Sequence, residues 1–192
     1  MNPSKISITK INLTNTAIKK LTDHYIALDI ETTGLNPQID KIIEIAAILF
    51  ENGKIIDKYS TLINPSRTIP FKVTQINNIT NRMVQNAPTE KEAYEQFPHF
   101  LQEALNGKII ICAHNAPFDI AFLKEFLEKQ DCTGSILYID TLPLAKSKIK
   151  NLRNYKQNTV ANHFKIHNKN PHRAFSDAET CGKILWKLLN IK

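Results

Sequence analysis

Alternating apolar and polar positions predict three β-strands in the first third of the chain. From His24 to Glu31 the side chains alternate with a period of two, which is the pattern of a strand. The stretch from Lys41 to Phe50 is almost wholly apolar, and Lys54 to Ile63 alternates again. Asn52-Gly53 lies between them and indicates a hairpin, because both central positions of a tight turn need positive φ. The last two of the three strands are therefore predicted to be antiparallel.

The rest of the chain has the pattern of helices and two further strands. Phe71 to Gln85 predicts short helical turns, and Thr89 to Leu105 is helical in composition, with Pro98 predicting a kink or two shorter helices. The elements that follow are a strand over Lys108 to Ala113, a helix over Pro117 to Lys129, a strand over Ile136 to Asp140, and two or three helices to the end. Strands first and then alternating strands and helices predict an α/β fold with a mixed sheet.

Composition indicates one soluble domain, or one domain with an extension. The chain has 192 residues, of which 42% are hydrophobic and 22% charged. Its three cysteines are widely spaced and form no Cys-x-x-Cys pair, which argues against a disulfide framework and a zinc site and fits a reducing cytoplasm. No apolar run approaches the roughly 18 residues of a membrane helix. We therefore expect a cytoplasmic protein with no membrane partner.

The amino-terminal segment differs from the rest in charge. Residues 1–20 carry four lysines, and no acidic residue precedes Asp23. The segment lacks the apolar stretch of a secretory signal and the arginines of a transit peptide. We predict a basic, partly ordered extension over residues 1–23 and the main domain over residues 24–192, with a targeting segment as the alternative.

The net charge of +7 favours a polyanionic partner, because Lys and Arg paired with phosphates are the usual source of nucleic-acid affinity. Arg153, Lys156, Lys169 and Arg173 gather near the end of the chain and are candidates to flank a substrate strand. The alternative is a solvated, lysine-rich face.

Asp29 and Glu31 are the first candidate chemical group. They lie two apart on one predicted strand, so both side chains project from the same face. Two charges on a strand of Ile, Leu and Ala are costly unless something neutralises them, and carboxylate oxygens are the ligands that Mg²⁺ prefers. The alternative is an exposed strand edge with solvated acids.

A second group follows the predicted strand that ends at Ala113. Asn115 is a candidate N-cap and Pro117 suits the first helical turn, so Asp119 is expected in that turn. The carboxyl end of a sheet strand is where ligand sites form in α/β proteins. An acid in a first turn also favours the helix dipole without any other function, and this alternative remains open.

The third group lies at the start of the last helix. Ser176 and Glu179 fit a capping box, which predicts that Asp177 begins this helix. Apolar positions follow at helical spacing, so Asp177 is expected on the inward side. His172 in the preceding loop is a candidate base, since an imidazole ordinarily gains and loses protons near neutral pH.

Together these segments resemble the three motifs of the DEDDh (DnaQ-like) 3′–5′ exonuclease family, which includes the proofreading epsilon subunit of bacterial DNA polymerase III. The matching motifs are Asp29-x-Glu31-Thr32-Thr33-Gly34-Leu35, His114-Asn115-Ala116-x-Phe118-Asp119 and His172-x-Ala174-x-x-Asp177. The resemblance runs from about Tyr25 to Leu189. It implies a ribonuclease-H-like fold, with a five-stranded mixed sheet whose first three strands are antiparallel and which is flanked by helices.

The resemblance also implies roles for individual residues. The expected metal ligands, for two Mg²⁺ or Mn²⁺ ions, are Asp29, Glu31, Asp119 and Asp177, and His172 is the expected general base. The expected substrate contacts are Thr32, Thr33, Gly34, Leu35, Asn77, Asn115, Phe118 and His172. The family often has His-Gly where this chain has Asn77-Asn78, so substrate affinity or preference is expected to differ.

By the same resemblance, the expected activity is metal-dependent 3′–5′ hydrolysis of DNA to nucleoside 5′-monophosphates, in proofreading or repair. The expected partners are nucleic acid with a free 3′ end and, as a further candidate, a DNA polymerase subunit. Thr32-Thr33-Gly34 after Glu31 resembles the DNA-processing members. The alternatives are an RNA 3′-trimming exonuclease of the same family and a catalytically silent nucleic-acid-binding module, although no metal ligand or base is lost here.

Overall fold

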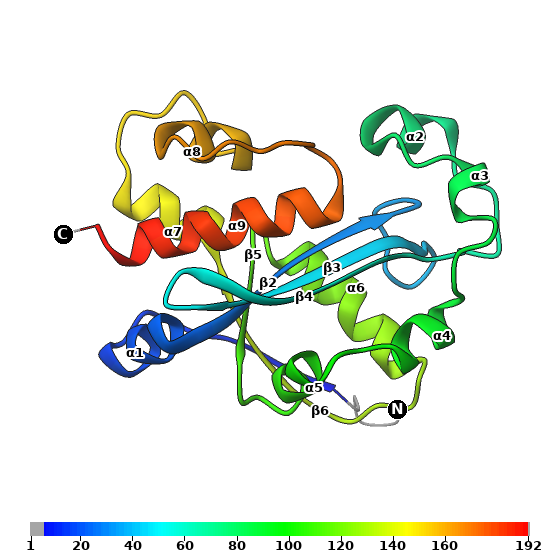
Figure 1. The fold of residues 1–192 in the computed structure, drawn as a ribbon, viewed down its shortest axis with the longest axis horizontal. Coiled ribbons are helices and arrows are strands. Elements are labelled where there is room, and N and C mark those ends of the chain that lie inside the picture. The colour runs from blue at the N-terminus through cyan, green and yellow to red at the C-terminus, as the bar shows by residue number, and fades with distance from the viewer. Residues whose placement is uncertain (1–5, 192) are drawn as a thin grey trace.

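The described part of the protein, residues 6–191 of a computed structural model, is built around a six-stranded mixed β-sheet (Figure 1). In spatial order the strands are β1, β6, β5, β2, β3 and β4. Their bounds are β1 Ile6–Lys10, β2 His24–Thr32, β3 Ile42–Glu51, β4 Lys54–Leu62, β5 Ile110–Ala113 and β6 Gly134–Asp140. β2, β3 and β4 are antiparallel to one another, whereas β5 pairs parallel with β2 and β6. The predicted α/β class and ribonuclease-H-like arrangement are therefore confirmed.

Helices cover both faces of the sheet (Figure 1). Their bounds are α1 Asn15–Asp23, α2 Phe71–Asn77, α3 Asn81–Val84, α4 Glu90–Glu95, α5 His99–Leu105, α6 Pro117–Glu128, α7 Thr141–Lys148, α8 Gln157–His163 and α9 Ala174–Leu189. α4, α5 and α6 pack on one face, and α1 and α9 pack on the other. The predicted division at Pro98 is confirmed, because this residue precedes α5 and separates it from α4.

The alternation along β2 decides which residues meet α9. Ile26, Leu28 and Ile30 pack into the cluster formed with α4 to α6, whereas Tyr25 and Ala27 pack into the cluster formed with α9. Side chains two apart on a strand share a face. Asp29 and Glu31 continue the series of Tyr25 and Ala27 along β2. Both acidic residues therefore lie on the face of the sheet that α9 covers.

β1 is a difference from the prediction, which had five strands. This strand pairs parallel with β6 at the edge of the sheet, from Ile6 opposite Gly134 to Lys10 opposite Tyr138. Only Ile6 of the five residues is buried, and the alternation of Ile6 and Ile8 with Ser7 and Thr9 is too short to reveal a strand as clearly as the others. α1 follows it and places Leu21 in the core. Residues 6–23 of the predicted extension thus form a strand and a helix, and residues 1–5 lie outside the described part.

The β3–β4 hairpin follows the prediction. Asn52 and Gly53 have φ values of 49° and 74°, as the turn requires.

Among the described residues, no helix combines the length and apolar character needed to cross a membrane.

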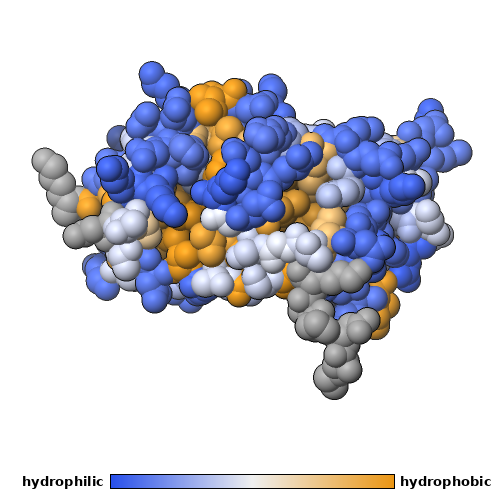
Figure 2. Space-filling view, turned by 90° about the horizontal axis from the view of Figure 1, so that it is seen from below, coloured by the Kyte–Doolittle hydropathy of each residue, from blue (hydrophilic) through white to orange (hydrophobic). Residues whose placement is uncertain are grey.

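Hydrophilic side chains predominate on the face seen in Figure 2, around a band of hydrophobic ones. The most exposed large apolar side chains of the described residues are Leu35 at 85%, Phe71 at 75%, Ile39 at 62% and Ile76 at 60%. Leu35 and Ile39 lie in the loop between β2 and β3, and Phe71 and Ile76 lie on α2. These two segments border the site described next.

Candidate active site

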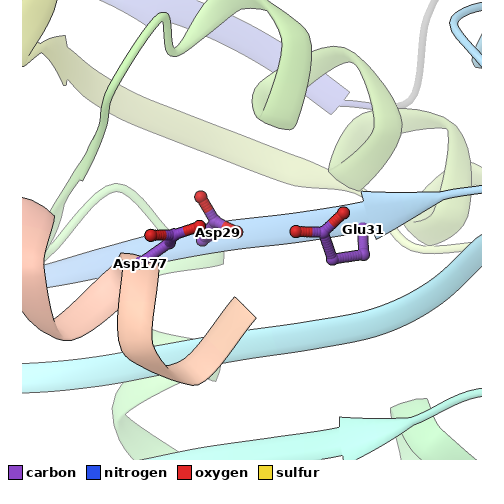
Figure 3. A group of neighbouring side chains, drawn as sticks. All are labelled: Asp29, Glu31 and Asp177. Atoms are coloured by element: carbon purple, nitrogen blue, oxygen red, sulfur yellow. The ribbon is translucent and has the colours of Figure 1, made fainter. Parts of the chain in front are cut away.

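Three carboxylates from two distant parts of the chain meet on the α9 face of the sheet. Asp29 and Glu31 project from β2, and Asp177 projects from the first turn of α9 (Figure 3). One carboxylate oxygen from each lies within 4.8 Å of those of the other two. The predicted convergence of the first and third motifs is thus present. Oxygen donors without sulfur or imidazole are the ligand set that suits Mg²⁺ and Mn²⁺.

Asp119 lies beside this group but points toward the strand. It belongs to the first turn of α6, as predicted, and only 5% of its surface is exposed. Its Oδ1 accepts a hydrogen bond of 3.0 Å from the backbone N–H of Ile30. This N–H is open because the pairing of β5 with β2 ends at Ala27. Asp119 therefore approaches β2 between Asp29 and Glu31, where the two strands separate.

The four carboxylates disfavour one another's ionisation. Burial, followed by the charges of Asp119 and Asp177, raises the pKa of Asp29 well above its usual range. Burial raises the pKa of Asp119 to about 8 and that of Glu31 to about 7, and it also raises the pKa of Asp177. Bound divalent cations would remove this penalty by supplying the missing positive charge.

Asp177 is held by hydrogen bonds that sequence reasoning missed. Asn168 Nδ2 donates to Asp177 Oδ1 at 2.6 Å, and Gln157 Nε2 donates to the same oxygen at 3.2 Å and to the Asp177 carbonyl at 2.9 Å. The backbone N–H of His172 donates to Oδ2 at 2.8 Å. Both oxygens are therefore oriented before any metal binds. Asn168 and Gln157 lie 9 and 20 residues from Asp177, and no local spacing signals such hydrogen bonds.

Glu44 is a second residue that the sequence did not reveal. It lies on β3 directly opposite Glu31, and its exposed fraction is 4%. Arg173 forms a two-pronged ion pair with it, from Nη2 to Oε1 at 2.7 Å and from Nε to Oε2 at 3.0 Å. The N–H of Ala174 donates to Oε2 at 2.9 Å. Glu44 thus holds two residues in place: Arg173, which follows His172, and Ala174, which begins α9.

Two predicted helix caps are wrong. Asn115 is not the N-cap of α6: its φ is 69°, its N–H donates to Asp140 at 3.0 Å, and the helix begins after Ala116. Ser176 lies inside α9, which begins at Ala174, and its hydroxyl donates to Asn168 at 2.6 Å. At Ser176 the hydroxyl that local spacing assigned to a cap is taken by Asn168, and at Asn115 the backbone conformation differs from the extended one of an N-cap. Asp119 and Asp177 nevertheless lie in first helical turns.

An apolar hollow opens beside Glu31. The lining residues are Ile30, Glu31, Thr32, Gly34, Leu35, Val73, Ile76, Asn77 and Phe118, five of which are predicted substrate contacts. Asn77 is buried in its wall and donates to Glu31 Oε2 at 3.2 Å. Asn78 adopts a φ of 59°, so it takes the left-handed conformation that glycine adopts readily.

Thr33 and Asn115 are not among the described residues that line this hollow. The Thr33 hydroxyl accepts a hydrogen bond from the Lys41 N–H at 3.0 Å, within the loop between β2 and β3.

A polar hollow opens on the other side, beside Asp29 and Asp177, with a volume of about 500 Å³. Its lining residues are Asp29, His114, Arg153, Asn154, Lys156, Gln157, Asn158, Thr159, His172 and Asp177. His172 is exposed and has a φ of 62°. The structure therefore places the predicted base in the same hollow as two of the carboxylates.

A mixed sheet with three antiparallel strands, and carboxylates at its centre, defines the class of ribonuclease-H-like nuclease folds. The chain belongs to the exonuclease family RNase_T, whose model matches residues 26–185. The predicted resemblance to the DEDDh exonucleases is thereby confirmed.

Curated relatives of the chain are much longer proteins. It is 40% identical over 163 residues to DNA polymerase III PolC-type of Clostridium perfringens, covering 85% of this chain and 11% of that protein. It is 37% identical over 172 residues to the 3′-5′ exonuclease DinG of Bacillus subtilis, covering 86% and 17%. The chain thus spans less than a fifth of either relative.

Solved structures share the fold. Exonuclease X in complex with 5′ overhanging duplex DNA has 26% identity and a TM-score of 0.66, with 86% of this chain and 91% of that chain covered. The nuclease domain of 3′hExo, a DEDDh family member bound to rAMP, has 17% identity and a TM-score of 0.73, with 88% and 92% covered.

Proposed function

We propose that this protein is a divalent-metal-dependent 3′–5′ exonuclease that removes nucleoside 5′-monophosphates from DNA, in proofreading or repair. The observation that carries the proposal is that three carboxylates form a row between the apolar hollow and the polar hollow. Asp177 and Asp29 lie at one end of this row and Glu31 lies at the other (Figure 3). A strand end lying across this row would place one phosphodiester over the carboxylates and its terminal nucleoside in the apolar hollow.

Each residue has a role in this proposal. Asp29, Glu31, Asp119 and Asp177 would hold two Mg²⁺ or Mn²⁺ ions, which when bound supply an activated water and stabilise charge on the leaving oxygen. His172 accepts the proton of the attacking water, a role that suits an imidazole side chain. Asn168, Gln157 and the N–H of His172 orient Asp177.

The nucleoside end of the substrate is proposed to lie in the apolar hollow. Phe118 and Leu35 provide the apolar surface on which a base stacks. Thr32 and Gly34 border the same space, and Asn77 reaches it beside Glu31.

DNA is the proposed polymer. It is supported by the 40% identical relative, which is a DNA polymerase, and by the 26% identical Exonuclease X, whose structure contains duplex DNA. RNA trimming remains the second candidate, because the similar fold of 3′hExo holds rAMP. A DNA polymerase subunit is the proposed protein partner, and the cytoplasm is the proposed location.

The test is a time course on 5′-labelled single-stranded DNA and RNA of one sequence, with Mg²⁺, with Mn²⁺ and with chelator. We expect a metal-dependent ladder that shortens from the 3′ end, faster on DNA. Asp29→Asn is the matched control, since it keeps the shape of the side chain and removes the negative charge of one metal ligand. Intact strands in every lane from folded protein would refute the exonuclease, and faster degradation of RNA would reverse the choice of polymer.

A further inference from the structure

The polar hollow has two walls of opposite charge. One wall carries Asp29 and Asp177, and the other is formed by residues 153–159, which lead into α8. This second wall presents the cations Arg153 and Lys156 among amide and hydroxyl side chains. A polyanion with neighbouring phosphates fits such a space, because one phosphate is held at the metal site while others meet the cations.

Arg153 and Lys156 are available for a ligand. Both are exposed, and within residues 6–191 no salt bridge joins either of them to a carboxylate. Arg173 differs, because its guanidinium is occupied by Glu44. Of the four basic residues predicted to flank the substrate, Arg153 and Lys156 therefore line the hollow, Arg173 pairs with Glu44, and Lys169 is not among the lining residues.

The segment that carries these cations is anchored to the active site. The carbonyl of Tyr155 lies 2.8 Å from His114 Nε2, and the Tyr155 hydroxyl donates to the carbonyl of Ile149 at 2.8 Å. Gln157 donates to Asp177. The distance between the backbone of this segment and the carboxylates is thus set by the fold, so only the side chains of Arg153 and Lys156 need to be ordered when a strand binds.

The direction of the substrate follows from the two hollows. The apolar hollow beside Glu31 suits a nucleoside, and the polar hollow beside Asp29 and Asp177 suits phosphates. We propose that Arg153 and Lys156 bind phosphates of the cleaved strand on the 5′ side of the scissile bond, so that the strand enters over α8 and ends in the apolar hollow. This inference rests on the proposed function and adds the path of the strand.

The test compares a substrate with upstream phosphates and one without them. The long substrate is single-stranded oligothymidylate, and the short one is the p-nitrophenyl ester of thymidine 5′-monophosphate, which has a single phosphate. The test variant is Arg153→Ala/Lys156→Ala. The matched control, Lys19→Ala/Lys20→Ala, removes the same charge from α1, which lies far from α8 (Figure 1).

We expect the test variant to raise KM for the oligonucleotide by about tenfold or more, since a hydrogen bond to a charged group contributes this much. The log–log slope of its salt dependence should become shallower by about 1.4, because each phosphate that a protein neutralises on a single strand accounts for about 0.7. Turnover of the ester should be unchanged, and the control should match the wild type on both substrates.

Two results would overturn the inference. An equal loss of activity on the ester and the oligonucleotide would place these residues at the reacting centre or in the fold. An unchanged KM and salt slope on the oligonucleotide would make them solvated surface residues. Fluorescence anisotropy of labelled oligothymidylate in Ca²⁺ measures binding by the same variants without cleavage. Failure of the exonuclease proposal and failure of the phosphate-binding proposal are thereby distinguished.

Discussion

Asp119→Asn is expected to stabilise the metal-free protein at alkaline pH while it abolishes metal-dependent activity. Burial raises the pKa of Asp119 from 3.8 to about 8. A carboxyl group with a raised pKa stabilises the fold below its ordinary pKa, and this contribution is lost as pH rises through about 8. Without metal, the wild type should therefore lose more stability between about pH 4 and pH 8 than the variant, which lacks this ionisation but keeps Asp29 and Glu31 with their raised pKa values.

The size of the effect follows from the pKa values. A rise of about 4 units corresponds to about 5 kcal/mol at 1.36 kcal/mol per unit, which is an upper limit on the gain at pH 8. The amide that replaces the Asp119 carboxyl keeps an oxygen that accepts from the Ile30 N–H, but burying its NH₂ group offsets part of the gain. We expect a net gain of about 2–4 kcal/mol at pH 8 and little or none at pH 5, because the electrostatic part falls to about a third there while the cost of burying the NH₂ group does not change.

Urea unfolding followed by circular dichroism, in chelator at pH 5 and pH 8, measures this difference. The slope of the unfolding free energy against urea should be the same for both proteins, because they expose the same surface. Added Mg²⁺ should then stabilise the wild type more than the variant. A variant that is no more stable than the wild type at pH 8 in chelator would refute the electrostatic reasoning.

Three further outcomes are expected. His172→Ala should lower turnover by about 10²–10⁴ without weakening Mn²⁺ binding measured by electron paramagnetic resonance, and a large loss of affinity would make His172 a ligand. Glu44→Gln removes the charge that pairs with Arg173, whose side chain is 28% exposed, so urea unfolding should show a loss of about 1.5–3 kcal/mol together with lower turnover. Unchanged stability would contradict this. The pKa of Glu31 is raised to about 7, so protons compete with the cation for this carboxylate. The Mg²⁺ concentration that gives half of the full activity should therefore increase as pH falls from about 8 to about 6. A constant concentration would argue against this competition.

Local patterns in the sequence were sufficient to predict the central strands and the positions of the carboxylates on them. Period-two alternation along β2 correctly places Asp29 and Glu31 on one face, because that strand is buried on both sides and its polar positions stand out. Asn52-Gly53 specifies the hairpin by its backbone conformation alone. These features depend on residues that are close together in the sequence, and a sequence pattern can reveal interactions only over such short separations.

Features that depend on distant partners were not predictable in this way. Glu44 looks like one acid on an apolar strand until Arg173, 129 residues later, is brought against it. Asn168 and Gln157 are polar residues in or beside loops and gain their role only when the chain folds around Asp177. The order of the elements, by contrast, resembled a known family closely enough to indicate the sheet topology.

The pairing of β1 with β6 has a consequence for synthesis on the ribosome. Ile6 lies opposite Gly134, so β1 cannot find its partner until more than a hundred further residues have been made. β2, β3 and β4 need only one another and are complete long before. β1 must therefore remain without its partner for that time, and its length of five residues and the charge of Lys10 make it a poor template for pairing with other nascent chains.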